Sequence, residues 1–325
     1  MEIIGTIGIL CAFWLIAWAG TSALLSVGWR WLWRRISAGH PFEREWALTG
    51  LATAPVTLAT WIILCLIAPG ALAVAFFGLD HCEQHSAHVH LCLFHPSAPL
   101  NSLTVSALLL CGSVAAVAGH STLRSIWATQ PLRALRSLES STLSRGAAII
   151  KSDLPFALTY GLASPRALIS TALLDALSPA QRKTVFAHES VHMRRRDPLR
   201  HLIARMSSVL VWPSVRAELL GELLLSTEQV CDEKTAEILG DRLQVAETIL
   251  AVERLVGGYP GAPPLALGID GGSLTARVSN LLDGKPRRRW RIGWLLAALV
   301  GVWIAAAPAL HHEAEHALDI VLGIF

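Results

Sequence analysis

Four stretches of this chain carry no aspartate, glutamate, lysine or arginine, and each is long enough to cross the hydrocarbon core of a membrane. They cover residues 3–29, 46–79, 99–123 and 292–310. A helix needs about 20 apolar residues for this, because each residue adds about 1.5 Å along the axis. Only 16% of the 325 residues are charged, against about 25% in soluble domains. The sequence therefore predicts a multi-pass α-helical membrane protein.

The basic residues predict how these spans are oriented. All 27 lysines and arginines lie in the windows 30–44 and 124–291, and cytoplasmic segments carry an excess of such residues. We therefore expect both termini and the loop 80–99 outside the cell membrane, and residues 124–291 in the cytoplasm. The formal charge of +3 then divides into +9 inside and −6 outside.

Three regions follow from this topology. Residues 1–123 would form three transmembrane helices and an outer loop, residues 124–289 a cytoplasmic domain, and residues 290–325 a fourth span with a short outer tail. Within the cytoplasmic domain, Ala167–Thr171 has the pattern of a strand, to which a peptide substrate could add as a further strand. Ser178-Pro-Ala-Gln181 has the residues of a capping box and predicts a helix that runs to about Arg196. The apolar segment Leu199–Trp212 predicts a helix in the core or in the membrane surface.

The capped helix contains the motif His188-Glu-Ser-Val-His192. Positions i and i+4 share one face of a helix, so both imidazoles can bind one metal ion. Glu189 lies beside them, where it can take a proton from a metal-bound water. Two imidazoles and a carboxylate suit zinc, with a fourth position left for water. We therefore expect a zinc-dependent metalloendopeptidase.

The same five-residue pattern occurs again at His312-Glu-Ala-Glu-His316. Only nine residues follow this second copy, which leaves no room for a downstream ligand, and it lies on the predicted outer side. Glu315 also places a charge inside the motif. We therefore interpret the first copy as the catalytic one.

A later helix offers the third metal ligand. Glu228-Gln-Val-Cys-Asp232 places two carboxylates four residues apart on one face. Glu228 would complete the metal site, and Asp232 would accept a hydrogen bond from a ligand imidazole. The alternative is a solvated acidic helix, because Glu233 and Glu237 follow.

These motifs together resemble a known family. The order His188-Glu-x-x-His192-x-x-Arg-x-Asp197, Trp212-Pro213 and Glu228-x-x-Cys-Asp232 is similar to that of the BlaR/MecR antirepressor membrane metallopeptidases. The segments Pro155–Gly161 and Pro165–Ile169 resemble that family upstream of the motif. The resemblance implies a mainly α, gluzincin-like zinc-metallopeptidase domain with a small β element. It implies zinc binding by His188, His192 and Glu228, and Glu189 as general base.

The resemblance also implies a partner, with one departure. Family members cut a cytoplasmic winged-helix repressor, or themselves, after sensing an external signal. The β-lactam-sensing members carry a penicillin-binding domain after the last span, whereas 15 residues follow Leu310 here. We therefore expect a short form without that sensor. The spacing of Glu228 and Asp232 also resembles the HtpX and CAAX-protease group, which leaves the substrate class open.

Eight of the 13 histidines fall on the predicted outer side. The spacings of His81, His85 and His88, and of His312 and His316, suit Cu or Zn binding if they are helical. Imidazoles also titrate near pH 6–7, so these residues form a candidate sensor of metal or pH. The alternative is a polar loop with solvated histidines. Cys82 and Cys92 share this loop and would pair if that side is oxidising.

The sequence is compatible with three functions. The leading one is a zinc endopeptidase that cuts a transcriptional repressor after an external signal. The others are an HtpX-like quality-control protease and a non-catalytic metal- or pH-sensing receptor. The basic residues cluster beside the spans and at Arg194-Arg-Arg196, which favours contact with the lipid bilayer over direct contact with nucleic acid. The sequence is also compatible with a homodimer.

Overall fold

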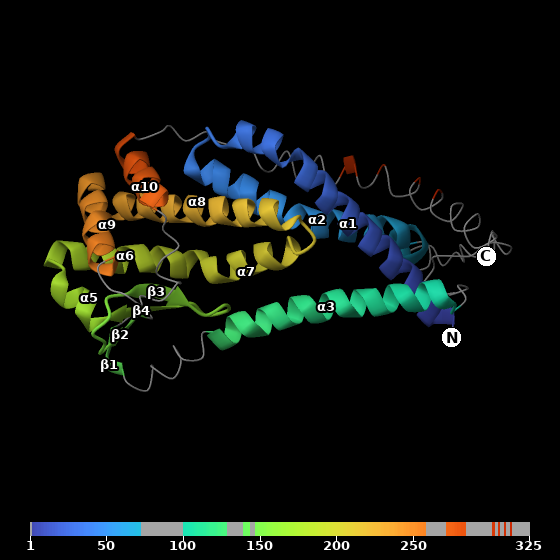
Figure 1. Ribbon diagram of the computed structural model, residues 1–325, viewed down its shortest axis with the longest axis horizontal. Coiled ribbons are helices and arrows are strands. Elements are labelled where there is room, and N and C mark those ends of the chain that lie inside the picture. The colour runs from blue at the N-terminus through green and yellow to red at the C-terminus, as the bar shows by residue number, and fades with distance from the viewer. Residues whose placement is uncertain are drawn as a thin grey trace.

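The computed structural model describes residues 2–72, 100–128, 139–143, 147–257 and 271–283, with five isolated residues near the C-terminus (301, 302, 305, 309 and 313) (Figure 1). Its helices are α1 (Glu2–Ile36), α2 (Pro41–Leu72), α3 (Ser102–Ala128), α5 (Thr171–Ala176), α6 (Pro179–Arg195), α7 (Asp197–Ser207), α8 (Pro213–Leu239), α9 (Arg242–Gly257) and α10 (Gly271–Asp283). Its strands are β1 (Glu139–Leu143), β2 (Ala147–Ile150), β3 (Ala157–Tyr160) and β4 (Arg166–Ser170). The prediction of a mainly helical chain with a small β element is confirmed. The predicted outer loop 80–99 lies outside the described residues, as do nearly all of the fourth span and the tail.

Two of the N-terminal helices are long and apolar enough to cross a membrane. The candidate spans are Ile3–Ile36 in α1 and Pro41–Ala68 in α2, whereas the apolar part of α3, Ser102–Val117, is shorter. Arginines 34 and 35 lie in the last turn of α1, where cations interact favourably with the helix dipole. These helices support membrane association, and the four-span topology stays a prediction.

Helices α1 and α3 approach each other closely at Gly8. A Cβ atom built on Gly8 would lie 2.7 Å from the Cβ of Thr104 and 2.8 Å from its carbonyl oxygen. No ordinary side chain fits there unless one helix moves. Gly8 therefore permits the close packing of the two helices.

Replacing Gly8 with alanine is expected to destabilise the protein by about 1–3 kcal/mol, because the new methyl group overpacks this contact. Gly20→Ala is the matched control, since Gly20 lies in the same helix and a Cβ atom placed on it would meet nothing within 4 Å. That control should gain up to about 1 kcal/mol of helix propensity. The thermal unfolding midpoints of both variants in detergent test this, and equal midpoints would contradict the close approach.

The sheet has the strand order β1-β2-β4-β3. Strand β4 pairs in parallel with β2 and antiparallel with β3. The predicted strand at Ala167–Thr171 exists as β4, except that Thr171 already begins α5, and neighbours occupy both edges of β4. A substrate strand cannot add to it, and the prediction of strand addition at this segment is wrong. The edge strand next to β4 is β3.

Side chains alternate between the two faces of the sheet, as the period of two in a strand requires. Ile149, Ala157 and Ile169 pack with apolar residues of α5, α6 and α9. Ala148, Leu158 and Leu168 belong to a separate cluster on the other face. The sheet is thereby fixed against α6, the helix of the His-Glu-x-x-His motif.

The helix that carries this motif begins as its sequence predicts. Ser178 caps α6, and its hydroxyl accepts a hydrogen bond from the backbone N–H of Gln181 while the Gln181 side chain binds the Ser178 N–H. Arg196 ends the helix in the left-handed conformation, with φ 54°. Because of this tight turn, α7 begins at once with Asp197 and Pro198. The predicted helix Leu199–Trp212 starts two residues earlier and ends at Ser207, before a short turn that leads into α8.

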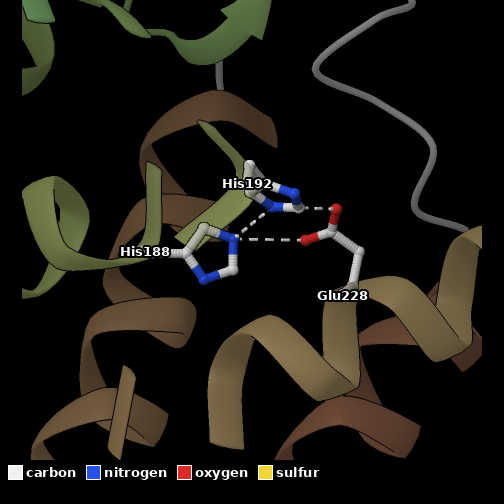
Figure 2. A group of neighbouring side chains, drawn as sticks. All are labelled: His188, His192 and Glu228. Atoms are coloured by element: carbon white, nitrogen blue, oxygen red, sulfur yellow. Dashed lines mark hydrogen bonds and ion pairs between the residues drawn. The ribbon is translucent and has the colours of Figure 1, made fainter. Parts of the chain in front are cut away.

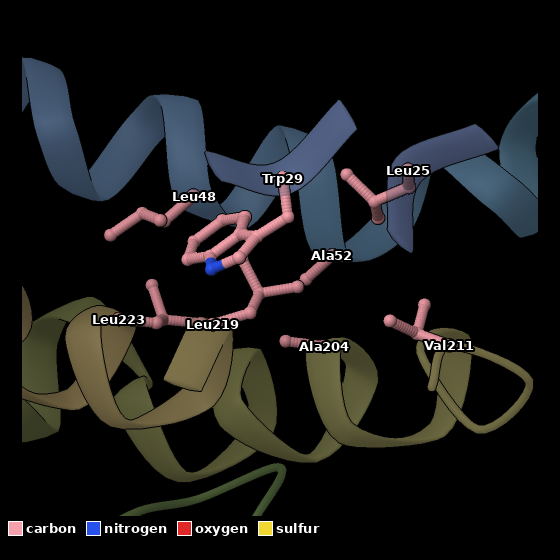
Figure 3. Close-up of a cluster of buried hydrophobic side chains, with 8 residues drawn as sticks. All are labelled: Leu25, Trp29, Leu48, Ala52, Ala204, Val211, Leu219 and Leu223. Atoms are coloured by element: carbon pink, nitrogen blue, oxygen red, sulfur yellow. The ribbon is translucent and has the colours of Figure 1, made fainter. Parts of the chain in front are cut away.

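One hydrophobic core joins the N-terminal helices to the helices that follow the motif (Figure 3). Its buried members are Leu25 and Trp29 of α1, Leu48 and Ala52 of α2, Ala204 of α7, Val211, and Leu219 and Leu223 of α8. The indole Nε1 of Trp18 also donates to the carbonyl oxygen of Ser207 at 3.2 Å. Ala204 of α7 is therefore part of this core, as one of the two predicted alternatives requires, and contact of α7 with the membrane surface stays a prediction. Movement of α1 or α2 cannot leave α7 and α8 unaffected, because they share this core.

Candidate metal centre

Two imidazoles from α6 and one carboxylate from α8 converge on one point (Figure 2). His188 and His192 lie one turn apart on α6, and their Nε2 atoms are 3.0 Å apart. Glu228 reaches them from α8, with one carboxylate oxygen 3.4 Å from His188 Nε2 and the other 3.5 Å from His192 Nε2. Glu228 is distant from the two histidines in the chain, and the packing of α6 against α8 brings the three residues together.

This donor set fits a tetrahedral metal ion. Bonds of about 2.0–2.1 Å from such an ion hold neighbouring ligand atoms roughly 3.3 Å apart. The observed separations of 3.0, 3.4 and 3.5 Å bracket that value. Three protein ligands would leave a fourth position for water, as in catalytic sites. The cluster can therefore hold a metal ion without a large rearrangement.

The other ring nitrogen of His188 faces Asp232. Its Nδ1 lies 3.2 Å from an Asp232 carboxylate oxygen, an arrangement that fixes the orientation of a metal-binding imidazole. Burial lowers the pKa of His188, but the hydrogen bonds and charges of Asp232 and Glu228 outweigh this and raise the pKa to about 10. In the metal-free protein, His188 therefore carries a proton at neutral pH.

Arg277 of α10 pairs with the two carboxylates on this side of the cluster. Its guanidinium donates to both oxygens of Asp232, at 2.8 and 2.7 Å, and lies 3.3 Å from Glu228. Burial raises the pKa of Asp232 and of Glu228, but the charge of Arg277 is the largest influence that lowers both, and the pKa of each carboxyl falls below its ordinary value. Both residues are thus held as carboxylates.

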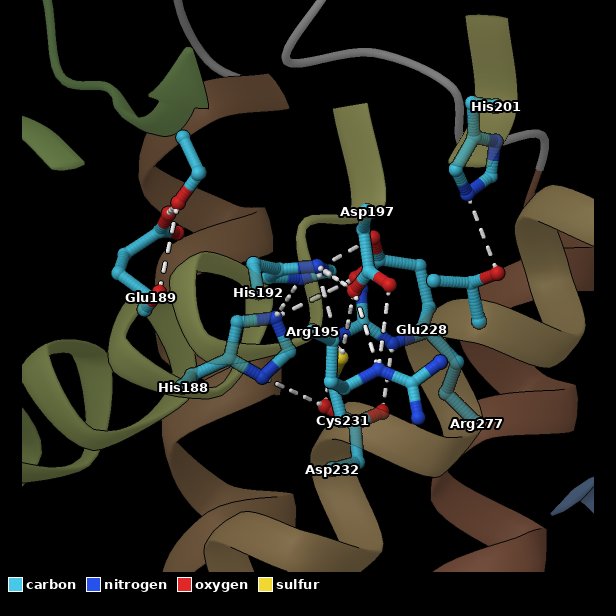
Figure 4. A network of polar contacts seen from close by, with 12 residues as sticks. His188, Glu189, His192, Arg195, Asp197, His201, Glu228, Cys231, Asp232 and Arg277 are labelled. Carbon is cyan, nitrogen blue, oxygen red and sulfur yellow. Dashed lines mark hydrogen bonds and ion pairs between the residues drawn. The ribbon is translucent and has the colours of Figure 1, made fainter. Parts of the chain in front are cut away.

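The other ring nitrogen of His192 faces Asp197. The distance from Nδ1 to a carboxylate oxygen is 2.8 Å, and Arg195 Nε lies 3.2 Å from both oxygens of the same carboxylate. Burial raises the pKa of Asp197, but His192 and Arg195 outweigh this and lower it to about 2. Each metal-binding imidazole therefore has a carboxylate of its own behind it (Figure 4).

A buried thiol completes this side of the cluster. Cys231 Sγ lies 3.4 Å from His192 Nδ1 and 3.5 Å from Asp197 Oδ2, so these three residues form a second group with metal-ligand atoms. Burial and the neighbouring carboxylates raise the pKa of Cys231 well above its ordinary value. A thiolate is the form that binds metals, so the neutral thiol is a poor ligand. His192, Glu228 and His188 remain the better metal site.

Glu189 lies between α6 and the edge strand β3. Its side chain is buried, and one carboxylate oxygen accepts a hydrogen bond from the hydroxyl of Thr159 at 2.7 Å. Thr159 lies on β3, on the same face as Ala157. Burial lowers the pKa of His192, but Glu228, Asp197 and, to a smaller extent, Glu189 raise it above its ordinary value. The Glu189 carboxylate is therefore fixed within electrostatic reach of the cluster.

The structure brings four of the sequence-predicted site residues into contact: His188, His192, Glu228 and Asp232. Glu189 lies beside them. The predicted sensor residues His81, His85, His88, His312 and His316 all lie outside the described residues. Sequence reasoning did not identify Thr159, Asp197 or Arg277 as parts of the site. It placed Arg195 in the basic cluster Arg194–Arg196 that would face lipid, which is wrong for Arg195, because this side chain pairs with Glu45 and Asp197 among the helices. Asp197 lies five residues after His192 in the same motif, so the sequence could have indicated that it belongs to the site. Nothing near Arg277 in the sequence indicates its role.

The geometry predicts that metal binding releases a proton. A metal ion must displace the proton from His188 Nε2, so lowering the pH should weaken binding by about tenfold per pH unit if one proton leaves. Isothermal titration calorimetry in two buffers of different ionisation enthalpy measures the number released. Asp232→Asn is the comparison, since it removes one of the two carboxylates that raise the pKa of His188 and should reduce proton release at neutral pH. Binding without proton release between pH 6 and 8 would contradict the pKa argument.

Comparison with known proteins bears on this site. A family model described as BlaR1 peptidase M56 matches residues 100–281, which include every described residue of the cluster. No curated protein and no solved structure matches the chain. The matched segment covers more than half of the chain and confirms the resemblance seen in the motifs. The chain belongs to the BlaR1 peptidase M56 family, whose members are metallopeptidases.

Proposed function

We propose that this protein is an integral-membrane zinc endopeptidase that hydrolyses peptide bonds on the cytoplasmic side. The observation that carries this proposal is the convergence of His188, His192 and Glu228 at separations that suit one tetrahedral ion. Family membership supports peptidase activity, and two imidazoles with one carboxylate favour zinc. The basic residues of the windows 30–44 and 124–291 support the cytoplasmic side.

Each residue of the site has a chemical task in this proposal. When bound, zinc would lower the pKa of a water molecule to about 7 and polarise the scissile carbonyl. Glu189 takes a proton from the attacking water and delivers it to the leaving amine. The hydroxyl of Thr159 holds the Glu189 carboxylate in place, and Asp232 and Asp197 hold the two imidazoles.

The substrate peptide would lie along β3. This strand is at the edge of the sheet, and its Thr159 contacts Glu189. An extended peptide that pairs with an exposed strand edge gains main-chain hydrogen bonds without dependence on its side chains. A scissile bond would then lie above α6, close to the histidines. This replaces β4 as the strand expected to bind substrate.

The physiological role that we propose is regulated proteolysis of a winged-helix transcriptional repressor. The resemblance to the antirepressor peptidases supports this role over general quality control. The two can be separated by profiling new protein N-termini in cells that express the wild type or the Glu189→Gln variant. One dominant Glu189-dependent product supports a dedicated substrate, and many unrelated membrane-protein products would support quality control.

The signal that we propose is external metal or pH, acting through the outer histidines. Purified wild-type protein in nanodiscs and a variant with alanine at every outer histidine would be compared for cleavage with external zinc or copper, and at pH 7.5 and 5.5. If the two proteins respond identically, the outer histidines are not the sensor. A His188→Ala variant that keeps the full cellular response would instead favour a non-catalytic receptor.

The direct test of the enzyme uses full-length protein in nanodiscs. Zinc content is measured by mass spectrometry of the metal, and cleavage of a peptide library is followed by mass spectrometry of the products. We expect one zinc ion per chain and metal-dependent products. His192→Ala should lose both. Stoichiometric zinc with no product from any peptide or protein substrate would refute the peptidase proposal.

A further inference from the structure

A buried carboxylate from α2 lies among the helices that carry the metal centre. Glu45 is in the second turn of α2 and is only 1% exposed. One of its oxygens binds Arg195, lies 2.6 Å from Arg200 Nη1 and lies 3.4 Å from the hydroxyl of Thr227. A buried carboxylate is costly unless it is paired. The two arginines therefore hold Glu45 in the peptidase helices.

The same two arginines bind Asp197, the residue behind His192. Arg195 Nε lies 3.2 Å from Asp197, and so does Arg200 Nη1. Asp197 in turn lies 2.8 Å from His192 Nδ1. A continuous series of charged contacts thus runs from α2 to a metal-binding imidazole (Figure 4 draws its part from Arg195 to His192).

The start of α2 also holds α8 on both sides of Glu228. Arg44 donates to the hydroxyl of Ser226 at 2.9 Å and to the side-chain carbonyl of Gln229. His40, just before α2, lies 3.1 Å from Glu233. Residues 40–45 therefore contact residues close to two metal-binding residues, Glu228 on α8 and His192 on α6.

We propose that Glu45 is a positioning residue for the metal centre. Arg195 and Arg200 each bind both Glu45 and Asp197, so Glu45 fixes where the two arginines lie. Through them it fixes the position of Asp197 and the orientation of the His192 imidazole. A shift of α2, a candidate membrane-spanning helix, would move this carboxylate and change the metal site. Displacement of α2 is thereby a route from the membrane to the active site. Glu45 can act in this way only if the proposed function holds and His192 binds a metal ion.

The test measures metal binding rather than cleavage alone. Full-length wild type, Glu45→Gln and Glu45→Ala are compared in nanodiscs for zinc affinity, by competition with a chelator, and for the visible absorption spectrum of bound Co²⁺. Glu43→Gln is the matched control, because Glu43 lies two residues earlier in α2 and, among the described residues, the structure shows no hydrogen bond or ion pair from it to the peptidase helices. Loss of a hydrogen-bond partner that contacts a metal ligand directly typically weakens metal affinity by about 10–100-fold. Glu45 acts on His192 through an arginine and Asp197, so the lower end of that range is expected.

We expect Glu45→Ala to weaken zinc binding within that range and to shift the Co²⁺ bands, with a smaller effect in Glu45→Gln and none in Glu43→Gln. Because coupling of binding free energies is reciprocal, zinc should also slow hydrogen exchange at the start of α2 in wild type and less in Glu45→Gln. A purely structural role would lower the unfolding midpoint while the folded variants kept wild-type affinity and spectrum, and that result would overturn the proposal. If Glu45→Ala does not fold, Glu45→Gln decides. A wild type that binds no metal would instead refute the proposed function.

Discussion

The Glu189→Gln variant is expected to lose nearly all peptide cleavage while it still binds its metal ion. General-base catalysis contributes about 10²–10⁴-fold in rate, and the amide cannot accept a proton as the carboxylate does. The substitution keeps the size of the side chain and an oxygen that can accept the hydrogen bond from Thr159, which in the wild type is 2.7 Å long. The local structure should therefore survive. Cleavage rate and metal content are measured on the same preparation.

Thr159→Val is the graded comparison for this variant. It removes the hydroxyl that orients Glu189 but leaves the carboxylate in place. We expect roughly a tenfold loss of cleavage, the effect of misplacing a general base rather than removing it. Glu189→Gln with cleavage close to that of the wild type would exclude Glu189 as the base, and another carboxylate would then have to be sought.

The Arg277→Met variant is expected to show the largest loss of stability. Arg277 is 8% exposed and pairs with Asp232 and Glu228. Removing one partner of a buried ion pair typically costs about 3–5 kcal/mol, because the other charge is left uncompensated. Here two carboxylates would be left. The free energy of unfolding of the metal-free protein in detergent is the quantity to measure.

Zinc should restore much of the stability that Arg277→Met loses. A divalent cation supplies positive charge to Glu228 directly and to Asp232 through His188, so the rise in unfolding midpoint on adding zinc should exceed that of wild type. Arg254→Met is the control: Arg254 is exposed on α9, where surface substitutions change stability by about 0.5 kcal/mol or less. An Arg277→Met variant as stable as that control would show that the buried charges are compensated in another way.

The local features of the peptidase region were accessible from the sequence. The Ser178 capping box and Pro179 predicted the start of α6, because these residues satisfy the free N–H groups of a first helical turn. The i, i+4 spacing of the histidines predicted a shared face for the same geometrical reason. The strand at residues 167–171 was also predicted, but its pairing on both sides was not. Pairing depends on segments distant in the chain, which no local pattern encodes.

The residues of the candidate site also fall into those that the sequence predicted and those that it did not. The motif spacing indicated His188, His192, Glu228 and Asp232, because each pair lies within a single helix. Arg277 lies 45 residues from its partner Asp232, and Glu45 lies 150 residues from Arg195. A single arginine or glutamate in an amphipathic stretch has the pattern of a solvated side chain, so neither could be assigned.

The sequence by itself determined that the chain is apolar enough for a membrane, that one helix carries a metal-binding motif and that a later helix carries carboxylates at a matching spacing. These are properties of composition and helical period, which depend on neighbouring residues. The tertiary structure decided which charges surround the metal-binding residues and that α2 supplies one of them. Packing of α2 and α10 against α8 buries these charges, and a buried charge must find its partner wherever the fold brings one, at any distance along the chain.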